Sequence, residues 1–225
     1  GNILLESLPV WLSAQTRKSA GRGRSAENTL QYGVQKLREL ILELAVRGKL
    51  VSQDPNDEPA SLLLKKIAEE KSRLVKEGKI KKQKILPPVS IQELLFQAPA
   101  GWGWTRLGVL FNSIISGGTP SKNNPAFWGG DIPWASVKDL GKARYIRSTQ
   151  DFITEEGLKK GSKLADVGDI LICTRMGLGK TAICESPIAI NQDLKAIKMS
   201  SHVSVDFFLN AYTTIDIKGT GTTVA

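Results

Sequence analysis

The pair Pro87-Pro88 divides the chain into two segments with different hydrophobic patterns. Proline lacks a backbone N–H and keeps the preceding residue out of the helical region, so a helix should not continue across this pair. Before the pair, apolar residues recur at helical spacing. After it, short apolar runs such as DIPWASV and GDILICTR alternate with Gly, Pro, Asn and Asp, which is typical of short strands and turns. The chain is therefore predicted to be α+β, with a helical segment followed by a mixed α/β segment.

Apolar residues of the first segment follow alternating spacings of four and three. They predict a helix with one apolar face that ends near Gly48, formed by Leu30, Val34, Leu37, Ile41, Leu44 and Val51. A second helix is predicted over about 60–77, between the turn-rich SQDPNDEP and Gly78. The two helices should form an antiparallel hairpin or coiled-coil arm. Its apolar faces either bury one another or bind a partner, and the candidates for partner binding are Leu37, Ile41 and Leu44.

Three parts are expected along the chain. Residues 1–28 are a Ser/Arg/Gly-rich extension that is expected to be poorly ordered, residues 29–84 form the helical arm, and residues 85–225 form the mixed domain. A further helix is expected near 205–212 within the mixed domain.

The balance of charges favours a polyanionic partner. The chain has 31 Lys/Arg and 22 Asp/Glu, a net charge of +9, and such an excess is most often found in nucleic-acid-binding proteins. Much of the excess lies in residues 65–84, with nine Lys/Arg against three Glu, whereas residues 85–225 hold 14 against 12. The basic run is either a solvated helix face or a contact surface for the polyanion.

Several classes of protein are disfavoured by composition. No apolar run approaches the roughly 18 residues of a membrane helix, and the N-terminal residues do not follow the order of a signal peptide. The two cysteines, Cys173 and Cys184, imply no disulfide framework, so a cytoplasmic protein is expected. The single histidine, His202, leaves no plausible Cys/His zinc cluster and no nucleophile–histidine–acid arrangement. We expect no metal, no cofactor and no catalytic site.

The stretch LICTRMGLGKTAI (171–183) is close to the phosphate loop of nucleotide-driven motors. A phosphate loop needs glycine at its first position and a helix that begins at the Lys-Ser/Thr pair. Here the first position is Thr174, and AICESPIAI after Lys180-Thr181 favours strand and turn. The alternative is a β-hairpin with strands 170–175 and 181–185, in which Cys173 and Cys184 lie almost opposite each other. We favour the hairpin over a fragment of an ATP-driven translocase.

Several stretches, taken in order, resemble the DNA-specificity subunit of Type I restriction-modification enzymes. LRELILELAVRGKL (37–50) and the following QDPNDEP stretch resemble its conserved helical region. GWGWTRLG (101–108), SGGTPSKNNPAFWGGDIPWASVKDL (116–140), GDILICTRMGLGKTAI (168–183), INQDLKAI (190–197) and GTGTTV (219–224) resemble its target recognition domain. Residues 1–25 match no part of that family's pattern.

The resemblance implies a non-catalytic subunit. Such a subunit binds double-stranded DNA and directs modification (methyltransferase) subunits, and through them a restriction motor, to one half of a split DNA site. ATP and the methyl donor would bind those partners. A complete subunit carries two recognition domains and this sequence shows one, so we expect a half-subunit or truncated form that pairs with a second copy or with modification subunits. The competing hypothesis is a helical adaptor that binds protein alone.

Four groups of residues are candidates for DNA contact. The tip of the predicted hairpin offers Arg175 and Lys180, which suit guanine or phosphate, together with Thr174, Met176 and Gly177. The polar turn before Trp128 offers small residues and hydroxyls for close approach to phosphates, namely Gly117, Gly118, Thr119, Ser121 and Lys122. A predicted strand places Trp134, Ser136 and Lys138 on alternate positions of one face. Asn191 and Gln192 suit adenine or, in their apolar neighbourhood, buried structural amides.

Overall fold

The computed structural model describes residues 26–214. They divide into two compact units, and most of the second predicted helix belongs to the same unit as the mixed domain. One unit holds the described residues up to Leu62 with Val89–Trp104, and the other holds Leu63–Pro88 with the described residues from Thr105. The GTGTTV block and nearly all of the predicted extension lie outside the described residues.

Helix α2 (Ala26–Val46) belongs to the first unit, and it ends where the sequence predicts. Gly48 has a φ of 64°, a value that favours glycine. Its N–H donates to the carbonyl of Ala45 at 3.0 Å, and the N–H of Lys49 donates to that of Leu44 at 2.8 Å. This pair of bonds is a Schellman cap, which satisfies carbonyls left open at the helix end.

The first unit is closed by contacts between the loop after α2 and the stretch around η1 (Ile91–Glu93). Trp102 Nε1 donates to Gln53 Oε1 at 2.7 Å. The Phe96 ring packs on Trp104 with centroids 4.7 Å apart, and the Arg47 guanidinium lies 5.6 Å from the Phe96 centroid. The GWGW motif therefore supplies structural aromatics here.

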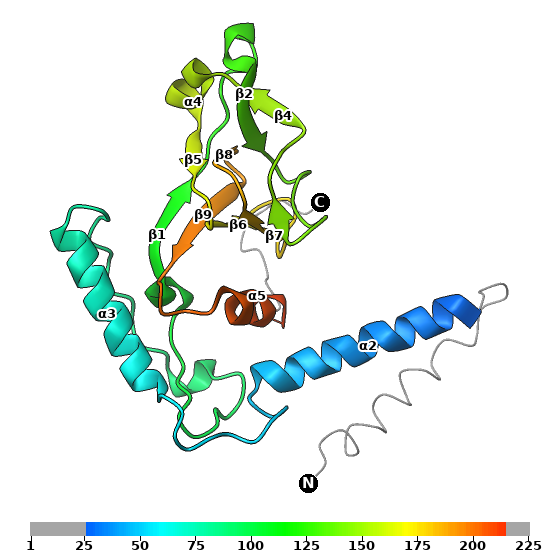
Figure 1. The fold of residues 1–225 in the computed structure, drawn as a ribbon, viewed down its shortest axis with the longest axis vertical. Helices are drawn as coiled ribbons and strands as arrows, with labels where there is room; N and C mark the ends of the chain where they lie inside the picture. The colour runs from blue at the N-terminus through cyan, green and yellow to red at the C-terminus, as the bar shows by residue number, and fades with distance from the viewer. Residues whose placement is uncertain (1–25, 215–225) are drawn as a thin grey trace. The chain divides into compact units, whose positions relative to one another are not determined.

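Two sheets form the centre of the second unit (Figure 1). The five-stranded sheet has the order β1 (Phe111–Ser116), β9 (Leu194–Met199), β6 (Ile170–Cys173), β7 (Thr181–Cys184) and β3 (Tyr145–Ile146). The four-stranded sheet has the order β4 (Asp151–Ile153), β2 (Trp128–Ala135), β8 (Ile188–Ile190) and β5 (Lys163–Ala165). The β2–β8 and β3–β7 pairs are parallel and the others antiparallel. The predicted α+β class is confirmed.

Helices cover the ends of these sheets. The predicted helix near residue 205 is α5 (Val205–Thr214), which lies beneath the five-stranded sheet in Figure 1. Phe208 of α5 packs edge-on against Phe111 of β1, with ring centroids 5.6 Å apart. At the other end, α4 (Glu155–Gly161) lies beside η3 (Pro125–Phe127), and η2 (Leu107–Leu110) precedes β1.

A buried carboxylate attaches α3 (Ala60–Lys76) to the second unit. Glu70 is 9% exposed and accepts hydrogen bonds from Asn112 Nδ2 at 3.0 Å, from the Ser200 hydroxyl, and from the Ser201 N–H at 3.2 Å. Burial by itself raises the pKa of Glu70, but these donors outweigh it and hold the pKa below its ordinary value. This polar face of α3 therefore packs on β1 and on the turn after β9. The expected packing of α3 against α2 stays a prediction.

The last part of the basic run, which follows α3, is also held on the second unit. Gln83 Nε2 donates to the carbonyls of Phe111 and Asn112 at 3.0 and 2.8 Å, and its Oε1 accepts from Lys71 Nζ at 3.0 Å. The Arg106 guanidinium donates to the carbonyls of Pro87 and Pro88 at 3.2 and 3.1 Å. Side chains fix this segment, which has no regular secondary structure of its own.

The LICTRMGLGKTAI stretch is a β-hairpin, as predicted. Strands β6 and β7 pair antiparallel, and the residues after Lys180-Thr181 form a strand instead of the helix that a phosphate loop requires. One detail of the prediction is wrong. Ile170 pairs with Ile183, so Cys173 and Cys184 lie at opposite ends of the ladder instead of facing each other.

Both thiols are buried and free. Burial raises the pKa of Cys173, and it raises the pKa of Cys184 to about 12. Because the thiolate is the reactive form, both side chains stay protonated at neutral pH and serve as core residues.

The described part of the chain shows no helix that combines the length and apolar character needed to cross a membrane. Within the same residues, no three or more His, Cys, Asp and Glu side chains are grouped to hold a metal ion.

Candidate nucleic-acid interface

The turn between β6 and β7 presents Arg175 and Met176 to solvent, with 59% of the Arg175 side chain and 54% of Met176 exposed. Met176 has a φ of 53°, a left-handed conformation that is uncommon outside glycine. The turn is closed at its base by the Cys173 N–H, which donates to the Lys180 carbonyl at 3.0 Å. Such backbone strain beside an exposed arginine is typical of functional loops.

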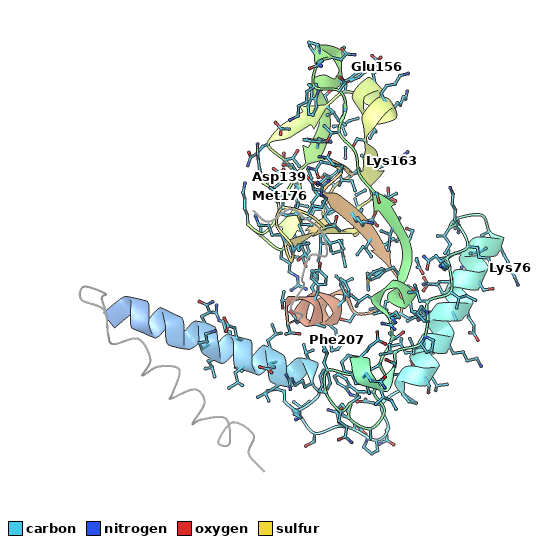
Figure 2. The ribbon with its side chains drawn as sticks, turned by 180° about the vertical axis from the view of Figure 1, so that it is seen from behind. Lys76, Asp139, Glu156, Lys163, Met176 and Phe207 are labelled. Carbon is cyan, nitrogen blue, oxygen red and sulfur yellow. The ribbon has the colours of Figure 1, made fainter. Side chains whose placement is uncertain are left out.

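A second turn, residues 136–142, packs beside the hairpin turn. A Cβ placed on Gly177 would lie 2.8 Å from Val137 Cγ1, and one placed on Gly141 would lie 3.2 Å from the Lys180 side chain. The Asp139 carboxylate caps this second turn, accepting from the Ser136 N–H at 2.8 Å. Asp139 and Met176 accordingly lie together on one side of the unit in Figure 2.

The loop after β8 completes the surface. The carbonyl of Asp193 accepts from the N–H and the hydroxyl of Thr174 at 2.9 and 3.2 Å. The Asp193 carboxylate lies 3.6 Å from Arg175 Nη1, and the neighbouring Gln192 is hydrogen-bonded to the Thr119 hydroxyl. We call the exposed atoms of residues 136–142, 174–180 and 191–193 the tip surface.

Cations dominate the tip surface. Lys138, Lys142 and Lys180 are exposed and form no ion pair with any residue between 26 and 214, while Arg175 pairs with Asp193. An arginine and a glutamine on one exposed surface are chemically suited to guanine and adenine edges, and lysines are suited to phosphates. The arrangement can bind a nucleic acid.

Known proteins with similar sequences share one description. The chain is 63% identical over 106 residues to the Type I restriction enzyme EcoAI specificity subunit of Escherichia coli, a match that covers 47% of this chain and 18% of that protein. It is 38% identical over 110 residues to the EcoR124I/EcoR124II specificity subunit, covering 46% and 27%. The MjaIX specificity subunit of Methanocaldococcus jannaschii is 37% identical over 87 residues, covering 37% and 20%.

The chain is a homologue of Type I specificity subunits. No family model matches the sequence. The matches span between 37% and 47% of this chain and between 18% and 27% of the length of these three relatives.

Two solved structures resemble this specificity-subunit homologue only distantly. One is the crystal structure of the HsdS subunit from Thermoanaerobacter tengcongensis, at 16% identity and a TM-score of 0.41, covering 92% of this chain and 50% of that chain. The other comes from work on complex assembly and conformational transition of the Type I R-M system, at 18% identity and a TM-score of 0.39, with the same coverage. The TM-scores are below 0.5, so the assignment rests on the sequence matches.

The structure of this homologue brings part of the predicted DNA-contact set together. The residues that lie on or beside the tip surface are Thr119, Lys138, Thr174, Arg175, Met176, Gly177, Lys180 and Gln192. Ser121 and Lys122 are exposed on the separate turn before β2. Their role in DNA contact stays a prediction.

The predicted strand face with Trp134, Ser136 and Lys138 is not formed. Strand β2 ends at Ala135, and Ser136 begins the Asp139-capped turn, so the alternation stops. Trp134 is 6% exposed and donates from Nε1 to the Gly118 carbonyl at 3.2 Å, while Ser136 is 9% exposed. Trp134 and Ser136 thus belong to the core and to a turn, and only Lys138 of the three is exposed.

Three further candidates are structural. A Cβ on Gly117 would lie 2.1 Å from the Asn191 carbonyl, and one on Gly118 would lie 2.3 Å from the Gly161 carbonyl. These glycines are needed for close backbone packing inside the unit, and a contact of their backbone with DNA stays a prediction. Asn191 is 6% exposed and its Oδ1 accepts from the Asp193 N–H at 3.0 Å, so it is the buried structural amide.

Sequence reasoning missed Asp193 and Lys142. The signal for Asp193 was present in the spacing Asn191-x-Asp193, because asparagine commonly bonds the N–H two residues on. Lys142 carried no local signal, because its place depends on the packing of two turns that are distant in sequence.

The predicted partner-binding residues lie on α2 in the first unit. Ile41 is 37% exposed, Leu37 and Leu44 are half-buried, and Val34 of the same face is 45% exposed. The apolar face of α2 is therefore partly open to solvent, and its role in partner binding stays a prediction.

The hairpin geometry makes a prediction about nucleotides. Purified protein is expected neither to hydrolyse ATP nor to bind it at micromolar concentration, because Thr174 replaces the first glycine and β7 replaces the phosphate-binding helix. Calorimetric titration with magnesium and ATP checks this, with Lys180→Ala as the comparison variant. Micromolar binding that is lost in the variant would contradict the hairpin interpretation.

Proposed function

We propose that the chain is a non-catalytic DNA-specificity subunit that directs methyltransferase subunits to one half of a bipartite DNA site. The observation that carries the proposal is the 63% identity to a Type I specificity subunit. The tip surface supports it with exposed Arg175, Lys180 and Gln192 on adjoining turns.

The partners follow from this role. Double-stranded DNA meets the tip surface, while modification subunits or a second copy of the chain meet the apolar face of α2. A restriction motor joins through the modification subunits, which also supply the binding sites for ATP and the methyl donor. This chain needs no cofactor of its own in that assembly, and it acts in the cytoplasm.

The test compares two kinds of basic residue in the assembled methyltransferase. Arg175→Ala is expected to relax the preference at one base position by roughly 1–3 kcal/mol, because a bidentate contact to guanine discriminates between bases. Neutralising Lys79, Lys81 and Lys82 is expected to weaken binding to all sequences alike and to reduce its salt dependence, if the basic run contacts phosphates. A site library, measured across a salt series, gives both quantities.

The end of α3, which leads into these lysines, lies away from the tip in the second unit. Lys76, the last residue of α3, lies on the opposite side of the second unit from Met176 in Figure 2. An Arg175→Ala complex with an unchanged site preference would remove the tip from the recognition surface. Purified assembly that binds no DNA at low salt, while still forming with its protein partners, would favour the helical adaptor.

A further inference from the structure

The backbone of Asp193 is held on the tip surface by three hydrogen bonds. Its N–H donates to Asn191 Oδ1 at 3.0 Å, and its carbonyl accepts twice from Thr174, at 2.9 and 3.2 Å. Only 16% of its side chain is exposed, compared with 59% for its ion-pair partner Arg175. The carboxylate is therefore a mostly buried group on a firmly held backbone, beside an arginine side chain that projects into solvent.

Arg175 is restrained from two directions. Its carbonyl accepts from the Cys173 thiol at 2.6 Å, and its Nη1 lies 3.6 Å from Asp193 Oδ1. A guanidinium carries five N–H donors in a planar fork, so an ion pair at one of them leaves others able to bind a ligand. Lys180, on the other flank of the turn, forms no ion pair within the described residues.

A carboxylate on a DNA-binding surface carries an electrostatic cost, because it repels phosphates. That cost is offset if the carboxylate fixes the orientation of an arginine whose guanidinium must approach a base edge in one particular geometry. Bidentate recognition of guanine demands such geometry, whereas attraction to phosphates does not.

We propose that Asp193 is a positioning residue for base recognition, which holds the Arg175 guanidinium in the orientation that contacts a guanine edge in the major groove. The inference rests on the proposed function and adds a residue that does not itself touch DNA. Asp193 acts through Arg175, and it is held in place by Asn191 and Thr174.

The experiment measures two quantities in the assembled methyltransferase, namely site preference in a library and affinity for non-specific duplex at several salt concentrations. Asp193→Asn keeps the backbone contacts and removes one negative charge. Preference at the base read by Arg175 should fall about tenfold, as expected for a misplaced base contact. Affinity for non-specific duplex should stay equal or rise, because a group that repels phosphate has been lost.

The matched control is Asp166→Asn, which removes the same charge from an exposed carboxylate that pairs with Lys198 elsewhere in the unit. It should leave the site preference unchanged. The double variant Arg175→Ala with Asp193→Asn should lose no more preference than Arg175→Ala alone, because positioning has no effect without the arginine.

The outcomes separate this inference from the proposed function. If Arg175→Ala relaxes the preference and Asp193→Asn does not, the carboxylate only competes for the arginine and the positioning role is overturned. If Asp193→Asn lowers specific and non-specific binding by the same factor, together with the melting temperature, its role is structural and the inference again fails. If neither variant changes the preference while the assembly still selects its site, the tip does not read bases, so the positioning role fails and the proposed function stands with another recognition surface.

Discussion

Replacing Glu70 by alanine is expected to cost about 2–4 kcal/mol of the free energy of unfolding. The substitution leaves the Ser200 hydroxyl, the Ser201 N–H and Asn112 Nδ2 without their charged acceptor in a buried site. Buried donors without a partner cost more than an average hydrogen bond contributes. Denaturant unfolding of the whole chain, followed by tryptophan fluorescence, measures the loss.

The neighbouring Glu69 provides the control. It is exposed and, among residues 26–214, its one ion pair is with Lys65 at 4.0 Å, so Glu69→Ala should change the free energy of unfolding by less than about 0.5 kcal/mol. Equal effects of the two alanine variants would show that the Glu70 contacts do not hold α3 on the domain.

The Glu70 effect should depend on pH in a definite direction. The pKa of Glu70 is held below its ordinary value of 4.5, so its ionised form stabilises the fold above that value. The stabilisation is lost as pH falls through the lower pKa of the folded state. The wild type should therefore exceed Glu70→Gln in free energy of unfolding by the full amount near neutral pH. This difference should shrink as the pH falls below the folded-state pKa of Glu70.

Changing Leu37 and Ile41 together to glutamate is expected to abolish association with a second copy or with modification subunits. Two carboxylates on the apolar face of α2 would have to be desolvated in any interface, which should cost roughly 4 kcal/mol or about a thousandfold in Kd. Sedimentation of the free chain and co-purification with modification subunits measure the loss. The second unit should stay folded.

Arg38→Glu is the matched control for that variant. It changes the net charge by the same amount on the exposed side of α2, so association should persist. A wild-type chain that sediments as a monomer and also fails to bind modification subunits would show that the face of α2 has no partner role.

Local patterns predicted most of the elements. The spacing of apolar residues located α2 and α3, and Gly48 and Gly78 stop them with φ values of 64° and 69°. The hairpin was predictable because its strands and its turn are adjacent in sequence. Its exact register was not, since a shift of one residue depends on packing against β9 and not on the turn alone.

The site was predictable only in part, because burial depends on contacts distant in sequence. Trp134 was predicted to contact DNA because it is an aromatic residue close to Ser136 and Lys138. In the structure it is buried, since its strand pairs with β8 and its Nε1 donates to the Gly118 carbonyl. In the sequence, Glu70 looks like one more charged residue on a solvent-exposed helix face. Its role as a buried acceptor depends on Ser200, which lies 130 residues further along the chain. No local pattern contains that information.

The attachment of α3 has a consequence for building chimeric specificity subunits. The Pro87-Pro88 pair is the natural place to join segments from different proteins if the sequence alone is considered. A joint there would combine Glu70 and Gln83 of one parent with Asn112 and Ser200 of the other. A transplanted recognition module should instead begin upstream of Leu63, so that α3 is transferred together with β1 and the turn after β9, on which it packs.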